Sequence, residues 1–180
     1  MDLRKMIVAA GLIGSAGLAC AGVSGLIQYP SVSPDGRTIV FSADGDLWSM
    51  DAKGGAASRL TVHPGIETRS AFSRDGKKIG FESNRDGAQN LYTLSIEGSG
   101  NSVLVRSLDR VTVSDRTQTL GGFNAEGDAL LFSASIYPEI YRHVSMYEAP
   151  IDGGAVTPIS AAYGRMPIET ADGEWTYFNR

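Results

Sequence analysis

The hydrophobic and polar positions of this 180-residue chain alternate in short segments and show no helical pattern. Beyond residue 21, short apolar runs recur, and turns rich in glycine, aspartate and asparagine separate them. No stretch there keeps the helical period of about 3.6 residues, so helices are not expected. β-branched and aromatic residues dominate the apolar runs, as they do in strands. The pattern predicts an all-β fold of short strands joined by tight turns.

A turn motif divides these strands into repeats. Its four copies end in glycine: Ser33-Pro34-Asp35-Gly36, Ser73-Arg74-Asp75-Gly76, Asn124-Ala125-Glu126-Gly127 and Thr170-Ala171-Asp172-Gly173. The glycines are 40, 51 and 46 residues apart, within the period of propeller blades. Five residues after each glycine stands a phenylalanine: Phe41, Phe81, Phe132 and Phe178. An ordinary β-sandwich would not repeat side-chain identity at a fixed register, so the repeats indicate a β-propeller.

Further signals within each repeat predict four strands. An apolar-aromatic pair follows the phenylalanine: Leu47-Trp48, Leu91-Tyr92 and Met146-Tyr147. A glycine turn comes six residues after the pair, and six more residues lead to a last apolar position: Leu60-Thr61, Leu104-Val105 and Ile159-Ser160. In the first repeat we expect strands over residues 28–33, 38–43, 46–51 and 58–61. Proline presets φ and glycine takes a positive φ in the turns that join them.

We therefore predict a β-propeller of four-stranded antiparallel blades, of which about three and a half are present. The blades cover about residues 28–62, 66–106, 117–160 and 165–180, within a partial propeller at 22–180. Since propellers close with about four to eight blades, this one is incomplete. Open sheet edges are an aggregation hazard. We expect the missing blades to come from the rest of a larger protein, or alternatively from a partner.

The N-terminal 21 residues have the layout of a secretory signal peptide. Arg4 and Lys5 precede an uncharged apolar run at residues 6–18, and Ala19-Cys20-Ala21 forms a cleavage site of small residues. The run is too short for the roughly 20 residues that span a bilayer. We expect a periplasmic or secreted protein with no membrane span. A lipid anchor through Cys20 is the less favoured alternative, because Gly17 and Leu18 fit a lipoprotein signal poorly.

Composition excludes several classes of function. Removal of Asp2, Arg4 and Lys5 with the signal changes the net charge from −4 to −5. A mildly acidic chain with scattered charges has no electrostatic footprint for nucleic acid. Cys20 is the only cysteine, so no disulfide framework is expected. No phosphate-binding loop is present, and we expect no cofactor.

The chain offers no combination of residues for catalysis or metal binding. His63 and His143 are far apart, and neither a Gly-x-Ser-x-Gly motif nor a His-Glu-x-x-His motif accompanies them. We expect structural roles for both histidines and assign no catalytic, cofactor-binding or metal-binding residue. The acidic segments at 44–46 and 84–87 lack the ligand spacing of a calcium loop and predict hairpin turns.

Two other features have a structural interpretation. Trp48, Tyr92 and Tyr147 stand at a fixed register, which favours packing between blades over a binding stripe. The segment from Ser107 to Gly122 is longer than its counterparts. We expect it to be a solvated loop carrying Asp109, Asp115 and Arg116.

These motifs resemble the WD40-like Pro-Asp-Gly repeat of TolB, tricorn protease and prolyl-oligopeptidase relatives. The stretches from Gly45 to Gly65 and from Arg69 to Ile79 are most similar to the first propeller of bacterial tricorn-type peptidases. So is the segment from Met146 to Gly154, and the resemblance covers about residues 28–180. Arg74 departs from the repeat's proline, and Ala125-Glu126 departs from its Pro-Asp.

The resemblance implies a non-catalytic module that binds or gates peptide or protein ligands in an exported tricorn-like peptidase, whose catalytic residues lie elsewhere. Whether the whole protein is an enzyme stays open. The alternative is a TolB-like periplasmic binding propeller without enzymatic activity, and a third candidate is the propeller of another exported hydrolase.

Overall fold

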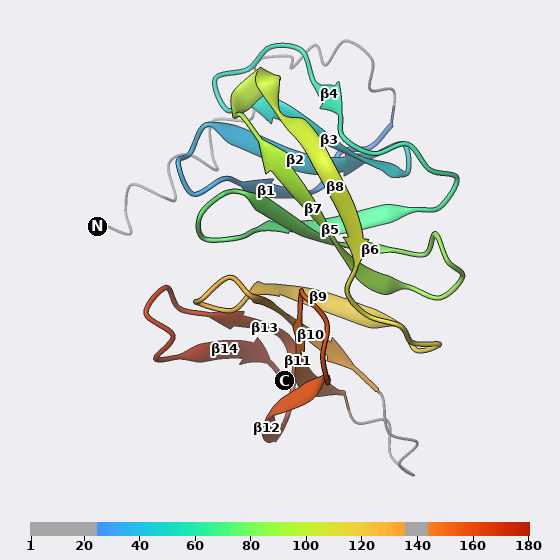
Figure 1. Ribbon diagram of the computed structural model, residues 1–180, viewed down its shortest axis with the longest axis vertical. Coiled ribbons are helices and arrows are strands. Elements are labelled where there is room, and N and C mark those ends of the chain that lie inside the picture. The colour runs from blue at the N-terminus through green and yellow to red at the C-terminus, as the bar shows by residue number, and fades with distance from the viewer. Residues whose placement is uncertain (1–24, 136–143) are drawn as a thin grey trace.

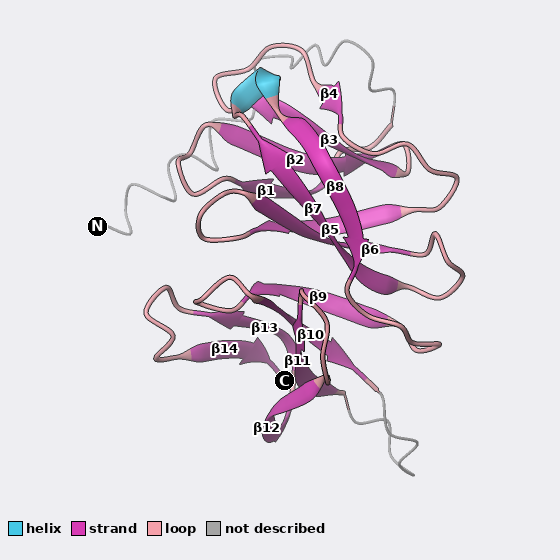
Figure 2. Ribbon diagram, in the orientation of Figure 1, coloured by secondary structure: helices cyan, strands magenta, loops and turns pink. Residues whose placement is uncertain are grey.

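The computed structural model describes residues 25–135 and 144–180, except for the side chains of residues 160–162. In this part the chain forms strands and one short 3-10 turn, η1 at Gly100–Ser102 (Figures 1 and 2). The first eight strands are β1 (Gln28–Val32), β2 (Thr38–Ala43), β3 (Asp46–Asp51), β4 (Ser58–Arg59), β5 (Glu67–Phe72), β6 (Lys78–Ser83), β7 (Asn90–Glu97) and β8 (Leu104–Arg110). The remaining strands are β9 (Gln118–Phe123), β10 (Ala129–Ala134), β11 (Ser145–Pro150), β12 (Thr157–Tyr163), β13 (Arg165–Glu169) and β14 (Thr176–Asn179).

The strands form consecutive antiparallel sheets in chain order. β1–β4, β5–β8 and β9–β12 each make a four-stranded sheet, and β13 pairs with β14. The first two sheets occupy the upper half of Figure 1, and β9–β14 lie below them. The inner strands of the sheets contact one another, β1 with β5, β5 with β9 and β9 with β13. This radial arrangement of four-stranded blades confirms the predicted all-β partial propeller, and it places β1, β5, β9 and β13 on the axial side.

The repeated turn is held by one hydrogen-bonding scheme. The hydroxyl of Ser33 donates to Asp35, which accepts the amide of Arg37, and the second repeat copies these contacts around Asp75. In the third repeat, the Asn124 side-chain oxygen accepts the amides of residues 127, 128 and 129. The carboxamide of Asn124 thus replaces the missing aspartate, and Ala125-Glu126 can follow it without loss of the turn.

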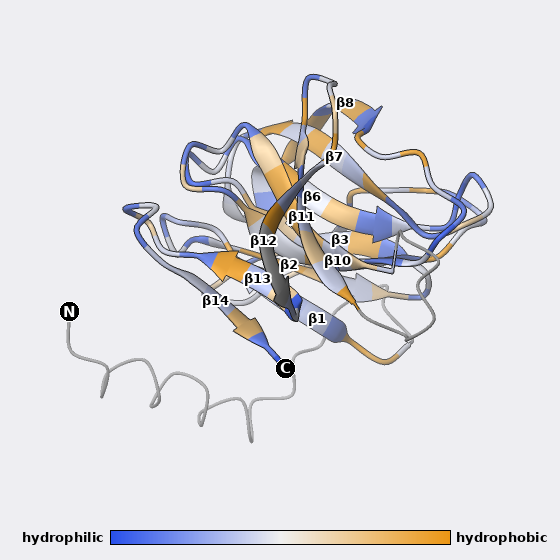
Figure 3. Cartoon of the chain, turned by 90° about the horizontal axis from the view of Figure 1, so that it is seen from below, coloured by the Kyte–Doolittle hydropathy of each residue, from blue (hydrophilic) through white to orange (hydrophobic). Residues whose placement is uncertain are grey.

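The hydrophobic core lies between neighbouring sheets. Val40 and Leu47 of the first sheet pack with Phe81 and Tyr92 of the second. Leu91, on the other face of the second sheet, packs with Phe132 and Tyr147 of the third, together with further residues of β9 and β10. Side chains on a strand alternate between faces. In the second sheet, Phe81 and Tyr92 therefore face the first sheet, and Leu91 faces the third. Hydrophobic colour accordingly follows the strands in Figure 3.

Trp48 differs from the other two aromatic residues at its register. Tyr92 and Tyr147 pack between sheets as predicted. Trp48 is only partly buried, and it packs on a cluster of its own sheet with Phe41 and Met50. Its face of the first sheet points away from the second, so the inter-blade packing of Trp48 stays a prediction.

The predicted solvated loop over residues 107–122 is confirmed only for its middle part, residues 111–117, and is wrong for the two ends. β8 continues to Arg110, with Asp109 paired to Thr93, and β9 begins at Gln118. The fourth strand of the second sheet is thus longer than β4 and as long as β12. Consequently the repeat position of Leu60 is occupied in the second sheet by Val111 and not by Leu104. The Val111 amide donates to the Leu91 carbonyl, as the Leu60 amide does to the Leu47 carbonyl. Only Asp115 and Arg116 of the named residues lie in the connection between sheets.

The predicted signal peptide, Cys20 and His143 lie outside the described residues. The domain boundaries and the exported location therefore stay predictions. In the described ranges, no helix has the length and apolar character needed to cross a membrane.

Candidate functional site

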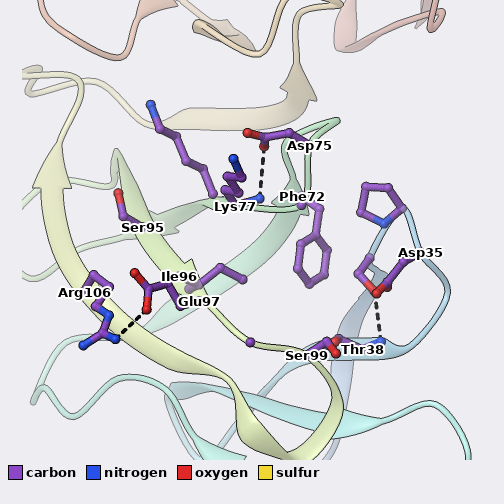
Figure 4. A pocket seen from close by; sticks show the side chains of 15 residues that line it. Asp35, Thr38, Phe72, Asp75, Lys77, Ser95, Ile96, Glu97, Ser99 and Arg106 are labelled. Carbon is purple, nitrogen blue, oxygen red and sulfur yellow. Dashed lines mark hydrogen bonds and ion pairs between the residues drawn. The ribbon is translucent and has the colours of Figure 1, made fainter.

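Two hollows are candidates for a binding site. The larger one, the inter-blade groove, has a volume of about 740 Å³ and lies between the Pro-Asp-Gly turns of the first two sheets (Figure 4). Its apolar wall contains Phe72 and Ile96. The smaller one, the axial pocket, has a volume of about 390 Å³ and lies where inner strands β5 and β9 begin. Its lining residues are Tyr29, Ile66, Thr68, Arg69, Glu82, Asn84, Gln89, Thr117 and Thr119.

The acidic groups of the inter-blade groove are engaged within the fold. The Ser33 hydroxyl, followed by the Arg37 amide, lowers the pKa of Asp35. The Lys77 amide and the Ser73 hydroxyl lower that of Asp75 despite its partial burial. Glu97 pairs with Arg106 at the groove's edge, and dashed lines in Figure 4 mark this pair and the contact of Asp75 with the Lys77 amide. The carboxylates therefore hold the turns and the β7–β8 pairing together.

The axial pocket is organised around a buried carboxylate, Glu82 at the end of β6. Its Oε1 accepts the amide of Leu120 in β9 at 2.7 Å, which joins the second sheet to the third. Its Oε2 accepts the Thr68 hydroxyl at 3.2 Å and the Gln89 side-chain amide. Arg69 Nε lies 3.6 Å from Oε1. The carboxylate thus meets donors from β5, β9 and the β6–β7 turn.

Burial raises the pKa of Glu82 to about 7. The Leu120 amide and the charge of Arg69 act in the opposite direction but do not offset the loss of hydration. Glu82 therefore changes its charge near neutral pH, within a pocket that contacts three sheets.

Arg69 and Tyr29 occupy matching positions in β5 and β1 with an unusual backbone. Their φ values are 49° and 50°, in the left-handed region, and both lie where the register of the inner strand shifts. Such a conformation costs a non-glycine residue roughly 1–3 kcal/mol. Met166 in β13 shares it at a φ of 53°, so the bulge belongs to the repeat. In the first two sheets it directs Tyr29 and Arg69 to the axial pocket, where the guanidinium stacks 4.6 Å from the phenol ring centroid.

Other buried charged or polar groups connect the sheets. Asp46, at the start of β3, pairs with Arg59 and accepts the hydroxyl of Thr61 and the amide of His63. Asn90 has the corresponding role in the second sheet. Its side-chain nitrogen donates to the Ser114 carbonyl, and its side-chain oxygen accepts the Ser114 amide. These side chains fasten the connections that lead to the next sheet.

The structure gives His63 a local role. It lies in the connection between the first two sheets, and its Nδ1 accepts the Gly65 amide at 3.0 Å. The acidic segments at 44–46 and 84–87 form the predicted turns between β2 and β3 and between β6 and β7, with Asp44 and Gly45 at positive φ. No group of three or more His, Cys, Asp or Glu residues suited to a metal ion occurs in the described ranges.

The sequence analysis did not single out Arg69 or Glu82. One signal for Glu82 was available. The phenylalanine is followed by a serine in β2 (Ser42) and in β10 (Ser133), whereas in β6 it is followed by a glutamate. A charged residue at a position that is buried in each four-stranded sheet indicates a partner inside the fold. No comparable signal marks Arg69, because a bulge cannot be read from residue types alone.

The blades and their radial order define a β-propeller domain. The family described as "Tricorn protease N-terminal beta propeller domain" matches residues 24–180. The chain therefore belongs to this family.

Individual comparisons agree with this assignment. Tricorn protease homolog 1 of Streptomyces coelicolor is 31% identical over 134 residues, which cover 74% of this chain and 12% of that protein. The crystal structure of the tricorn protease superposes with a TM-score of 0.67 at 22% identity, over 83% of this chain and 14% of the other. TolB from Acinetobacter baumannii gives 0.61 at 25% identity, over 85% and 36%. The chain thus spans a small part of these proteins.

Proposed function

We propose that this chain is a non-catalytic segment of an exported tricorn-like peptidase that binds peptide or protein ligands and guides them through its axial pocket. The observation that carries the proposal is a polar pocket on the axial side, formed by three sheets of a tricorn-family propeller. Channel-side pockets are suited to extended ligands because residues from several blades converge there. The remaining blades would come from the rest of the protein or from a partner.

A TolB-like binding propeller is the second candidate. It is supported by the TM-score of 0.61 to TolB from Acinetobacter baumannii. Both candidates assign ligand binding to this chain, and they differ in whether a peptidase accompanies it. The coding sequence beyond residue 180 distinguishes them: a serine peptidase core supports the first, and an end after two or three further blades supports the second.

The binding role is tested by fluorescence anisotropy with a set of labelled unstructured peptides. Thr117 is exposed at the rim of the axial pocket, so Thr117→Trp should block it with little effect on the fold. Thr157→Trp in β12 is the matched control, since Thr157 is exposed and remote from the lining residues. We expect saturable binding that is weakened at least about tenfold by Thr117→Trp and kept by Thr157→Trp. Equal affinity of both variants would refute binding at this pocket.

A further inference from the structure

Arg69 has unused hydrogen-bonding capacity in the axial pocket. Its Nε is near Glu82 and its guanidinium stacks on Tyr29, but within the described ranges no hydrogen bond engages its two terminal nitrogens. Its side chain is 32% exposed. A guanidinium presents N–H groups in a planar fork that matches a carboxylate. Arg69 can therefore accept an anionic ligand without leaving its position.

Other groups of the pocket are also able to donate to a ligand. The Asn84 side-chain nitrogen and the hydroxyls of Thr117, Thr119 and Tyr29 make no hydrogen bond to another described residue. Glu82 is the only acidic residue in the lining. Both of its oxygens already accept hydrogen bonds from the fold. The Arg69 guanidinium and the Asn84 nitrogen can only donate, so they favour a ligand that supplies acceptors.

Glu82 competes with such a ligand. When it is ionised, it attracts the Arg69 guanidinium and repels a second carboxylate. When it is protonated, the repulsion disappears and Arg69 is available to the ligand. The groups that face Glu82 are Arg69 and Thr68 from β5, the Leu120 amide from β9 and Gln89 from the β6–β7 turn; Arg69 is the only charged one among them.

We propose that the axial pocket binds the carboxylate of an acidic side chain on a peptide or protein ligand, and that Glu82 takes up a proton as it binds. The inference rests on the proposed function, which it makes more specific. Arg69 exchanges its ion pair with Glu82 for one with the ligand, while the proton for Glu82 comes from the solvent.

The pH dependence follows from linkage. A bound carboxylate raises the pKa of Glu82 above its value of about 7 in the free chain. Between these two values, binding takes up a proton and the affinity rises as the pH falls. Below about pH 7 the free chain is already protonated at Glu82, and the affinity levels off. A like charge at close range shifts a pKa by about one unit or more, so the affinity should change about tenfold or more.

The test is isothermal titration calorimetry of the full chain with two N-acetylated, C-amidated peptides that differ only in a central Glu or Gln. At pH 6 we expect the Glu peptide to bind at least about tenfold more tightly than the Gln peptide, and at pH 9 we expect most of this preference to be lost. Titrations near pH 8 in buffers of different ionisation enthalpy should show uptake of up to one proton per bound Glu peptide.

Three variants assign the effect to named residues, and thermal melting establishes that each is folded. Arg69→Gln should abolish the preference for the Glu peptide at both pH values. Glu82→Gln should keep the preference at pH 9 and take up no proton. Arg37→Gln, an exposed arginine outside the pocket, should behave as the parent chain.

Each contradictory outcome has a distinct meaning. If both peptides bind equally at pH 6, the inference is wrong and the proposed peptide-binding function stands. If proton uptake persists in Glu82→Gln, the assignment to Glu82 is wrong. If neither peptide binds at either pH, the inference and the proposed function both fail.

Discussion

At the scale of single residues, one repeat position serves different purposes in different sheets. Ser42 and Ser133 follow the phenylalanines of β2 and β10, whereas Glu82 in β6 reaches across to the Leu120 amide of the next sheet. Asn124 similarly accepts the amide of Asp128, whose counterparts in the first two turns donate to an aspartate. The repeat fixes the backbone, and individual polar side chains then adapt it to a local task.

Glu82→Gln should change how stability depends on pH. The folded chain holds a proton on Glu82 more tightly than the unfolded chain, whose carboxyl has a pKa near 4.5. Glu82 therefore lowers the free energy of unfolding progressively as the pH rises from about 4.5 to about 7, by up to about 3 kcal/mol above that range. Denaturant unfolding at pH 5 and pH 8 should show that Glu82→Gln loses this decrease.

The exposed Glu174→Gln is the control, and its pH dependence should match that of the parent chain. Parallel curves for Glu82→Gln and the parent would contradict the burial of an ionisable Glu82.

Residue patterns were sufficient to locate the turns but not the pocket. The glycines and phenylalanines at fixed spacing identified every sheet, because blade geometry imposes the same demands in each repeat. Arg69 and Glu82 lie on paired strands of the second sheet, but a bulge turns Arg69 toward the carboxylate, and Glu82 accepts the Leu120 amide of the third sheet. Such contacts depend on tertiary packing, which a single repeat does not encode.

At the scale of elements, neighbouring sheets approach closely where an inner strand lacks side chains. Gly121 in β9 lies against β13, and a Cβ at this position would collide with the backbone of Pro167. Gly122, the next residue of the same strand, has no atom within 4 Å of its ideal Cβ. The close contact of β9 with β13 therefore depends on Gly121 and not on Gly122.

Gly121→Ala should destabilise the chain, and Gly122→Ala should not. Overpacking against backbone typically costs about 1–3 kcal/mol, whereas a substitution into open space changes stability by about 0.5 kcal/mol or less. Urea unfolding of the two variants measures the difference directly. Equal stabilities would mean that β13 does not pack on β9 as described.

The elements of the second sheet also explain why its last strand was predicted at the wrong place. The regular six-residue intervals predicted a last strand near Leu104, but β8 extends to Arg110 because the η1 turn and a longer hairpin precede the connection. An insertion of this kind preserves the apolar character of the segment, so hydropathy alone did not reveal it.

At the scale of the whole molecule, the chain is a set of propeller blades in a family whose characterised relatives are far longer. Its match to residues 24–180 establishes the family, and the activity of a complete protein is a proposal. Apolar side chains of the last strands are exposed, with Ile168 at 52% and Tyr177 at 65%. Exposed apolar groups of this kind are typical of surfaces that meet another part of a protein.

We predict that the purified chain has no peptidase activity. The sequence has no Gly-x-Ser-x-Gly motif, and His63, the only histidine in the ranges that the structure describes, uses Nδ1 to accept the Gly65 amide. A quenched fluorogenic peptide set should give rates equal to buffer. Hydrolysis that survives repeated purification and follows the protein peak would contradict a purely binding role.

The most direct test of ligand binding on the axial side is hydrogen–deuterium exchange of the chain with and without a bound peptide. We predict slower exchange in the segments that line the axial pocket, residues 66–69, 82–89 and 117–120, with little change in the inter-blade groove at 33–38 and 95–99. Protection confined to the groove, or no protection in the presence of saturating peptide, would contradict the account.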